Sequence, residues 1–182
     1  MTEEIVELPV RQQVEPVVGF KTLNLRLRSG SIEMSGMRSS YHGVTERAKC
    51  SAYPKPGVAH EAPLLTCTCG FYAYDELEHI YSWRREIVGT VEMFGTVINH
   101  EKGYRASHQR VTALAVGRPC DQCKEFGDER RVADAFYFNM SGDSYRLCAE
   151  HGAMSEKLNA AMRMTLAEMA ERLEIEVAWC RG

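Results

Sequence analysis

Two groups of cysteine and histidine have spacings that suit metal coordination, and the second along the chain is the more regular. It combines Cys120-x-x-Cys123 with Cys148-x-x-His151, and a hairpin fits the interval between the two pairs. Two residues between ligands let one tight turn aim both side chains at one ion, and two such turns complete a tetrahedron. We expect a structural zinc site with three thiolates, one imidazole and no open position. The alternative is a set of redox-active or free cysteines.

The first group lies in a loop rich in proline and glycine. Its members are Cys50, His60, Cys67 and Cys69, and a single residue separates the last two cysteines. Gly70 follows directly, and a glycine there leaves the backbone free to fold around an ion. We expect a second structural zinc site with these four ligands. Of the seven cysteines, three then serve each site and Cys180 is spare.

Other interpretations of this first group stay open. His42 or His79 replaces His60 as the imidazole ligand, or the four residues bind no metal. A catalytic metal is a further alternative, because Glu61 is adjacent to His60 and a catalytic site keeps a water and often uses a carboxylate.

Residues 99–110, NHEKGYRASHQR, are the third stretch with chemical potential. Tyr104 and Arg105 suit stacking on, or clamping, a base, a phosphate or a carboxylate. His100 and Glu101 suit an acid/base pair. The simpler interpretation is a polar hairpin turn in which Arg105 pairs with Glu101. We keep Tyr104 and Arg105 as candidate ligand or partner contacts.

Arg84 and Arg85 are two further candidate contacts, although a solvated helix end explains them equally well. No catalytic motif accompanies any of these residues: the sequence has no G-x-S-x-G, P-loop, Rossmann glycine pattern or H-E-x-x-H. The P-C-x-x-C at residues 119–123 lacks the upstream H-x-E of zinc deaminases. We therefore expect a protein that is not an enzyme.

The segments on either side of the first Cys/His group are predicted to form mainly β-strands. Residues 19–28 alternate apolar and polar side chains, which predicts a half-buried strand, and residues 32–37 suit its return. Asp75 and Glu78 resemble a capping box and predict a short helix over 76–85. Residues 87–115 predict a sheet with a turn at 101–103, and Gly89 and Gly95 suggest bulges or sharp coiling.

The second group sits in a different predicted unit. A hairpin is expected over 132–148, followed by a long helix that Ser155 caps and a final strand or extended tail over 175–179. The helix is expected to bury one apolar stripe, formed by Leu158, Met162, Thr165, Leu166, Met169 and Leu173. The fold class is α+β, with a flexible lead-in (1–16), a β-rich zinc-loop module (17–117) and a zinc-stabilised hairpin-helix module (118–182).

Composition and charge bound the function classes. The chain has 182 residues, 45% of them apolar, and a net charge of -3, so no global basic field draws it to nucleic acid. Residues 17–117 are mildly basic, with twelve Lys or Arg against nine Asp or Glu, a local charge of +3. The sequence has no apolar run long enough for a membrane span and no secretory signal, which predicts a cytoplasmic protein.

Residues 19–116 resemble a family of small proteins seen in actinobacteria and their phages. The resemblance rests on CTCGFYAY at residues 67–74 and on GTVEMFGTVINHEKGYRASHQRVTAL at 89–114. It implies a Cys/His-rich loop that ends in CxCG, and it supports Cys50, His60, Cys67 and Cys69 as one ligand set. Residues 120–172 are similar to the zinc-bearing hairpin-helix module of actinobacterial nucleoid-associated proteins. The first resemblance implies architecture and lineage rather than a mechanism.

We expect a zinc-stabilised binding or regulatory protein, phage-encoded or actinobacterial, that acts on a host protein. The first alternative is nucleic-acid binding by the mildly basic middle module, through the cations Lys21, Arg26, Arg28, Arg38, Arg84, Arg85 and Arg105. The second alternative is an enzyme with a site around His42, His100, Glu101 and Arg105. A homodimer through the methionine-rich C-terminal helix is a further prediction.

Overall fold

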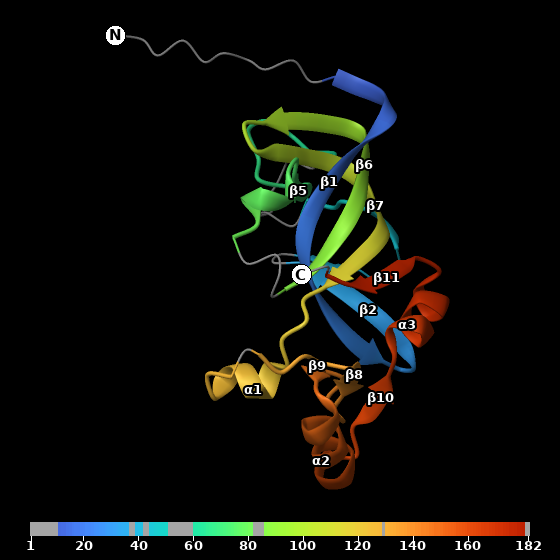
Figure 1. The fold of residues 1–182 in the computed structure, drawn as a ribbon. Coiled ribbons are helices and arrows are strands. Elements are labelled where there is room, and N and C mark those ends of the chain that lie inside the picture. Colours follow the sequence, from blue (N-terminus) through green and yellow to red (C-terminus); the bar gives the residue numbers. More distant parts are fainter. Residues whose placement is uncertain are drawn as a thin grey trace.

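The computed structural model describes residues 11–36, 39–41, 44–50, 60–81, 86–128 and 130–180. This part of the protein is mostly β, with short helices (Figure 1). The larger sheet has eight strands: β1 (Arg11–Arg28), β2 (Ser31–Gly36), β3 (Ser39–Tyr41), β4 (Thr45–Arg47), β5 (Phe71–Tyr74), β6 (Ile87–His100), β7 (Gly103–Val116) and β11 (Glu176–Trp179). The smaller sheet contains β8 (Ala135–Phe138), β9 (Ser144–Leu147) and β10 (Met162–Met164). The α-helices are α1 (Asp121–Glu125), α2 (Ala149–Asn159) and α3 (Leu166–Leu173).

The larger sheet closes on itself. Strand β6 pairs antiparallel with β1 on one side and with β7 on the other, and β5 pairs antiparallel with β7. The pair Phe20 and Tyr74 then joins β5 to β1, so β1, β6, β7 and β5 form a ring. The predicted hairpins at 19–37, 87–115 and 132–148 are confirmed, and β11 adds one parallel pairing with β7.

The two glycines of β6 serve different purposes. Gly95 has φ 79° and sits where the β6–β7 register shifts between Phe94 and Val97, so the predicted bulge is present there. Gly89 lies in regular pairing, and a Cβ at this position would come within 2.5 Å of the Leu23 side chain. Its role is close packing against β1 rather than a bulge.

Three local predictions need correction. The lead-in of residues 1–16 is too long, because β1 already begins at Arg11, while residues 1–10 lie outside the described part. Of the helix predicted over 76–85, residues 82–85 lie outside the described part, and residues 76–81 contain one 3-10 turn, Leu77–His79. The Asp75 carboxylate bonds the His79 ring, 2.9 Å away, and no side chain caps the start of that turn.

The long C-terminal helix is the third correction. Helix α2 begins before Ser155 and ends where Ala160 turns left-handed, with φ 48°. Strand β10 follows and pairs with β8, which places Met164 in the core. A capping box of Thr165 and Glu168 then starts α3.

No helix of the described part is long and apolar enough to cross a membrane.

One apolar core runs across the predicted boundary at residue 117. Phe136, Phe138 and Met169 are buried in the same cluster as Leu25 and Met34 of β1 and β2. The turn between β8 and β9 docks on β1, where the Leu27 amide donates to the Gly142 carbonyl at 2.8 Å. The two predicted units therefore share a core. A second, smaller buried cluster brings Cys120, Cys123 and Cys148 together with Ala135, Tyr137, Leu147 and Ala161.

A buried polar pair bridges this ring. Lys21 on β1 and Gln109 on β7 are both buried, and Lys21 Nζ donates to Gln109 Oε1 at 3.0 Å. Lys21 Nζ also lies 5.7 Å from the Phe71 ring centroid. Burial lowers the pKa of the Lys21 ammonium from 10.5 to about 8. The folded protein therefore releases this proton at a lower pH than the unfolded chain does.

This difference predicts how stability changes with pH. Between about pH 8 and pH 10.5 the unfolded chain binds more protons at Lys21, so the free energy of unfolding rises with pH. Lys21→Met is expected to remove this rise. Urea unfolding followed by circular dichroism at several pH values measures the free energy of unfolding of both proteins. Equal pH slopes in the wild type and in Lys21→Met would show that Lys21 titrates normally in the folded state.

Candidate metal centres

Centre 2 (Cys120, Cys123, Cys148 and His151) is built from the first turns of two helices. Cys120 precedes α1 and Cys148 precedes α2, both with extended backbone, while Cys123 and His151 follow one turn later. Each helix thus presents a pair of ligands on one side of its N-terminus. The N-terminal end of a helix carries partial positive charge, which favours thiolates there.

The distances within centre 2 fit one tetrahedral ion. His151 Nδ1 lies 3.5, 3.3 and 3.5 Å from the sulfurs of Cys120, Cys123 and Cys148, and the Cys123 and Cys148 sulfurs are 4.0 Å apart. Zinc bonds of about 2.3 Å to sulfur and about 2.0 Å to nitrogen imply separations of about 3.8 Å for two sulfurs and about 3.5 Å for sulfur and nitrogen. The four side chains therefore enclose a space of the size that a metal ion needs.

The electrostatics of centre 2 also call for a cation. Burial, with Cys120 adding to it, raises the pKa of the Cys123 thiol to about 12. Three buried thiolates are costly unless a positive ion compensates them. Arg131 supplies part of the charge, because its guanidinium bonds the Glu150 carboxylate and the Cys148 sulfur, which raises the pKa of Arg131.

Centre 1 (Cys50, His60, Cys67 and Cys69) assembles from a loop and the approach to β5. The Cys50 and Cys67 sulfurs are 3.7 Å apart, and His60 Nε2 lies 3.3 Å from the Cys69 sulfur. In both centres the four ligand atoms lie within 4.8 Å of one another. Both expected ligand sets are therefore brought together, and each Cys3His group is geometrically suited to a metal ion.

Two of the other candidates for centre 1, His79 and Glu61, have different partners. His79 bonds Asp75, and the exposed Glu61 carboxylate bonds Arg47 at 2.9 Å. His42 lies outside the described residues.

A hydrogen bond from the Cys69 backbone lowers the pKa of the Cys67 thiol to about 7, which favours the thiolate that a metal binds.

Arg105 anchors the loop of centre 1 to the sheet. It is only 4% exposed, its guanidinium donates to the Cys67 carbonyl, and it lies 5.7 Å from the Tyr72 ring centroid. The Tyr72 hydroxyl donates to the Thr68 carbonyl at 2.9 Å, which adds a second anchor. The sequence marked Arg105 as a residue of interest, but this position favours an anchoring role over contact with a partner.

The remaining candidate contacts are less informative. Tyr104 is half-buried and packs against the core, and His100 is exposed at the end of β6 with its ring stacked 6.4 Å from that of Tyr72. Arg84 and Arg85 lie outside the described residues. Sequence reasoning did not single out Tyr72 and Tyr74. Their alternation with Phe71 and Ala73 along β5 is the signal that places them on its outer face.

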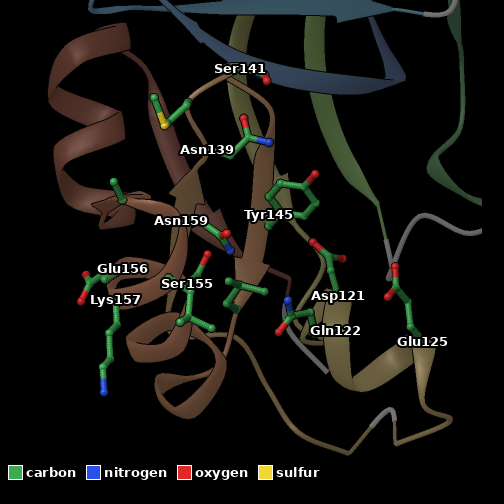
Figure 2. A pocket seen from close by; sticks show the side chains of 14 residues that line it. Asp121, Gln122, Glu125, Asn139, Ser141, Tyr145, Ser155, Glu156, Lys157 and Asn159 are labelled. Atoms are coloured by element: carbon green, nitrogen blue, oxygen red, sulfur yellow. The ribbon is translucent and has the colours of Figure 1, made fainter.

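A cavity of about 670 Å³ lies beside centre 2, between α1, the β8–β9 turn and the end of α2 (Figure 2). Asp121, Glu125, Tyr145 and Glu156 are among its lining residues. Asp121 accepts hydrogen bonds from Arg146, and no cysteine or histidine is among the residues that line the cavity. The arrangement offers no nucleophile beside a histidine base.

Comparisons with protein-family models, with curated proteins and with solved structures found no match to this chain. The resemblance to an actinobacterial and phage family thus stays a prediction.

Cys148→Ser is expected to reduce the bound metal from two ions per chain to one, because a serine hydroxyl is a poor replacement for a thiolate. Since metal binding is coupled to folding, α1 and α2 should also lose protection from hydrogen exchange. Elemental analysis of the purified protein measures the first effect. The matched control is Cys180→Ser, which changes a buried cysteine outside both centres and should keep two ions. A Cys148→Ser protein that retains both ions contradicts the ligand assignment.

Cys67→Ser is expected to release the other ion and to leave centre 2 intact. The hydrogen bond from Arg105 to the carbonyl of residue 67, which serine keeps, then holds the loop without the support of the metal, so hydrogen exchange should quicken in β5 and in the adjoining part of β7. Mass spectrometry of exchanged peptides, compared with the Cys148→Ser protein, separates the two effects. Unchanged exchange in β5 would mean that the loop holds its place without the metal.

Proposed function

We propose that this protein is a non-enzymatic binding protein that two structural zinc ions stabilise and that acts on a protein partner. The observation that carries the proposal is the closure of both centres. Each supplies four protein ligands, three sulfurs and one imidazole nitrogen, which is a full tetrahedral set.

The donor chemistry supports zinc in particular. Soft thiolates combined with imidazole in a tetrahedral arrangement select zinc or iron over magnesium and calcium, which prefer oxygen ligands. A catalytic zinc keeps one position for water or substrate, whereas a complete set of protein ligands serves folding. Both metals therefore stabilise the fold around a binding surface.

The outer face of β5 is our candidate for that surface. Tyr72 and Tyr74 are 41% and 43% exposed there, beside the loop of centre 1, in which Leu64 and Leu65 are exposed as well. The ring of His100 stacks near Tyr72. Tyrosines with an apolar ring and a polar hydroxyl are common anchors in protein interfaces.

Several basic residues of the middle module are already engaged, which weakens the nucleic-acid alternative. Lys21 and Arg105 are buried, and Arg26 forms an ion pair of 2.6 Å with Asp143. Cations already engaged in this way release fewer counterions from a phosphate backbone. Arg38, Arg84 and Arg85 lie outside the described residues.

The cavity beside centre 2 does not support the enzyme alternative. His100, Glu101 and Arg105 are not among the residues that line the cavity beside centre 2, and Arg105 is buried while His100 and Glu101 are exposed. This cavity therefore cannot hold a substrate against the proposed acid/base pair, His100 and Glu101.

Tyr74→Ala is expected to weaken partner binding at least about tenfold, which corresponds to about 1.4 kcal/mol, because truncating a hot-spot tyrosine of an interface costs about 2 kcal/mol or more. The test is affinity capture from a cell lysate treated with nuclease, with the captured protein then purified and its dissociation constant measured. The melting temperature should stay close to that of the wild type, because Tyr74 is half exposed.

Phe126→Ala is the matched control, since Phe126 is 84% exposed at the end of α1, away from β5 (Figure 1). It should bind like the wild type. Capture that nuclease abolishes, or that falls steeply with salt, would instead support the nucleic-acid alternative. Equal losses in the two variants would contradict the assignment of β5 as the binding face.

A further inference from the structure

The two centres have the same ligands but differ in exposure. In centre 2, Cys120, Cys123 and Cys148 are 0%, 4% and 8% exposed. In centre 1, Cys50 and Cys67 are half-buried, and only Cys69 is buried. Oxidation of cysteine depends on thiolate character and on access for the oxidant. Two sets of metal-bound thiolates in one chain should then react at different rates.

We propose that Cys50 and Cys67 are a peroxide-sensitive pair, and that their oxidation to a disulfide releases the zinc of centre 1 while centre 2 keeps its own. This inference rests on the proposed function in one respect: it requires both centres to hold metal. It adds a modification site and a class of reactant, a peroxide, to one of them.

The chemistry needs only these two sulfurs and the peroxide. One thiolate attacks a peroxide oxygen, the O–O bond breaks, and a sulfenic acid and hydroxide form. The second thiolate attacks the sulfenic sulfur, the S–S bond forms and a second hydroxide leaves. Two thiolates lose two electrons, and hydrogen peroxide gains them; the two hydroxides formed are neutralised by protons from the buffer. The sulfurs of Cys50 and Cys67 are 3.7 Å apart, so the second attack requires little movement.

Loss of these two ligands leaves only His60 and Cys69 at centre 1, which is too few for a stable tetrahedral site. Centre 2 is better protected. Its three sulfurs are buried at two helix N-termini, and the side chain of Arg131 bonds both Glu150 and the Cys148 sulfur. A peroxide molecule has little access to them.

The oxidation site is connected to the proposed binding face. Arg105 holds the Cys67 carbonyl, and Tyr72 holds the Thr68 carbonyl, one residue further along the loop. When centre 1 opens, the loop loses its metal support next to Tyr72. Oxidation is therefore expected to alter the outer face of β5, whereas the core around Phe136 and Met169 stays intact.

The test is a time course of the full-length protein with hydrogen peroxide. A colorimetric zinc indicator follows release, and mass spectrometry of alkylated peptides identifies the oxidised cysteines. The expected result is one zinc released about tenfold faster than the other, together with a Cys50–Cys67 disulfide. The same experiment on Cys180→Ser excludes disulfides that involve the spare cysteine and should give the same rates.

Release of both zinc ions at one rate, earlier release from centre 2, or zinc loss without a Cys50–Cys67 disulfide would each overturn the inference and leave the proposed function standing. A freshly purified protein that holds no zinc overturns both, and this outcome is recognised before any peroxide is added.

Discussion

The close approach of three cysteine sulfurs and one histidine nitrogen, at two places in the chain, is the constraint on which the rest of the structure depends. Each centre draws side chains from separate segments, and three thiolates in a small space repel one another unless a cation lies between them. Centre 1 fastens a loop to β5 and β7, and centre 2 joins the first turns of α1 and α2 next to the small sheet. In the described part of the chain the helices are few and short, so we expect bound metal to add stability at these two places.

The shared core explains how the two centres act within one molecule. Aromatic side chains of β8 pack in the same cluster as apolar side chains of β1 and β2, and Phe136 stacks 6.4 Å from the Trp179 ring of β11. After the segments of centre 2, the chain adds β11 to the larger sheet, where it pairs with β7. Loss of either centre should weaken a common core, but the segments next to that centre should respond first.

Much of this architecture follows from local sequence patterns. Ligand spacing identified both Cys3His groups, and the alternation of apolar residues predicted the hairpins of β1–β2, β6–β7 and β8–β9. The prediction of one long C-terminal helix is wrong, because the apolar residues from Leu158 to Leu173 belong to three elements, α2, β10 and α3. Thr165 and Glu168 form a capping box that was visible in the sequence and marked a new helix start. The closure of the ring through Phe20 and Tyr74, and the burial of Arg105 beneath the loop, depend on distant segments that no local pattern reveals.

The central claim is that the protein holds two closed Cys3His zinc centres, and X-ray absorption at the zinc edge, combined with elemental analysis, tests it most directly. The account predicts two zinc ions per chain, each with on average three sulfurs at about 2.3 Å and one nitrogen at about 2.0 Å. A single zinc per chain, or a spectrum that requires oxygen ligands, would contradict it, because an oxygen ligand means a position open to water.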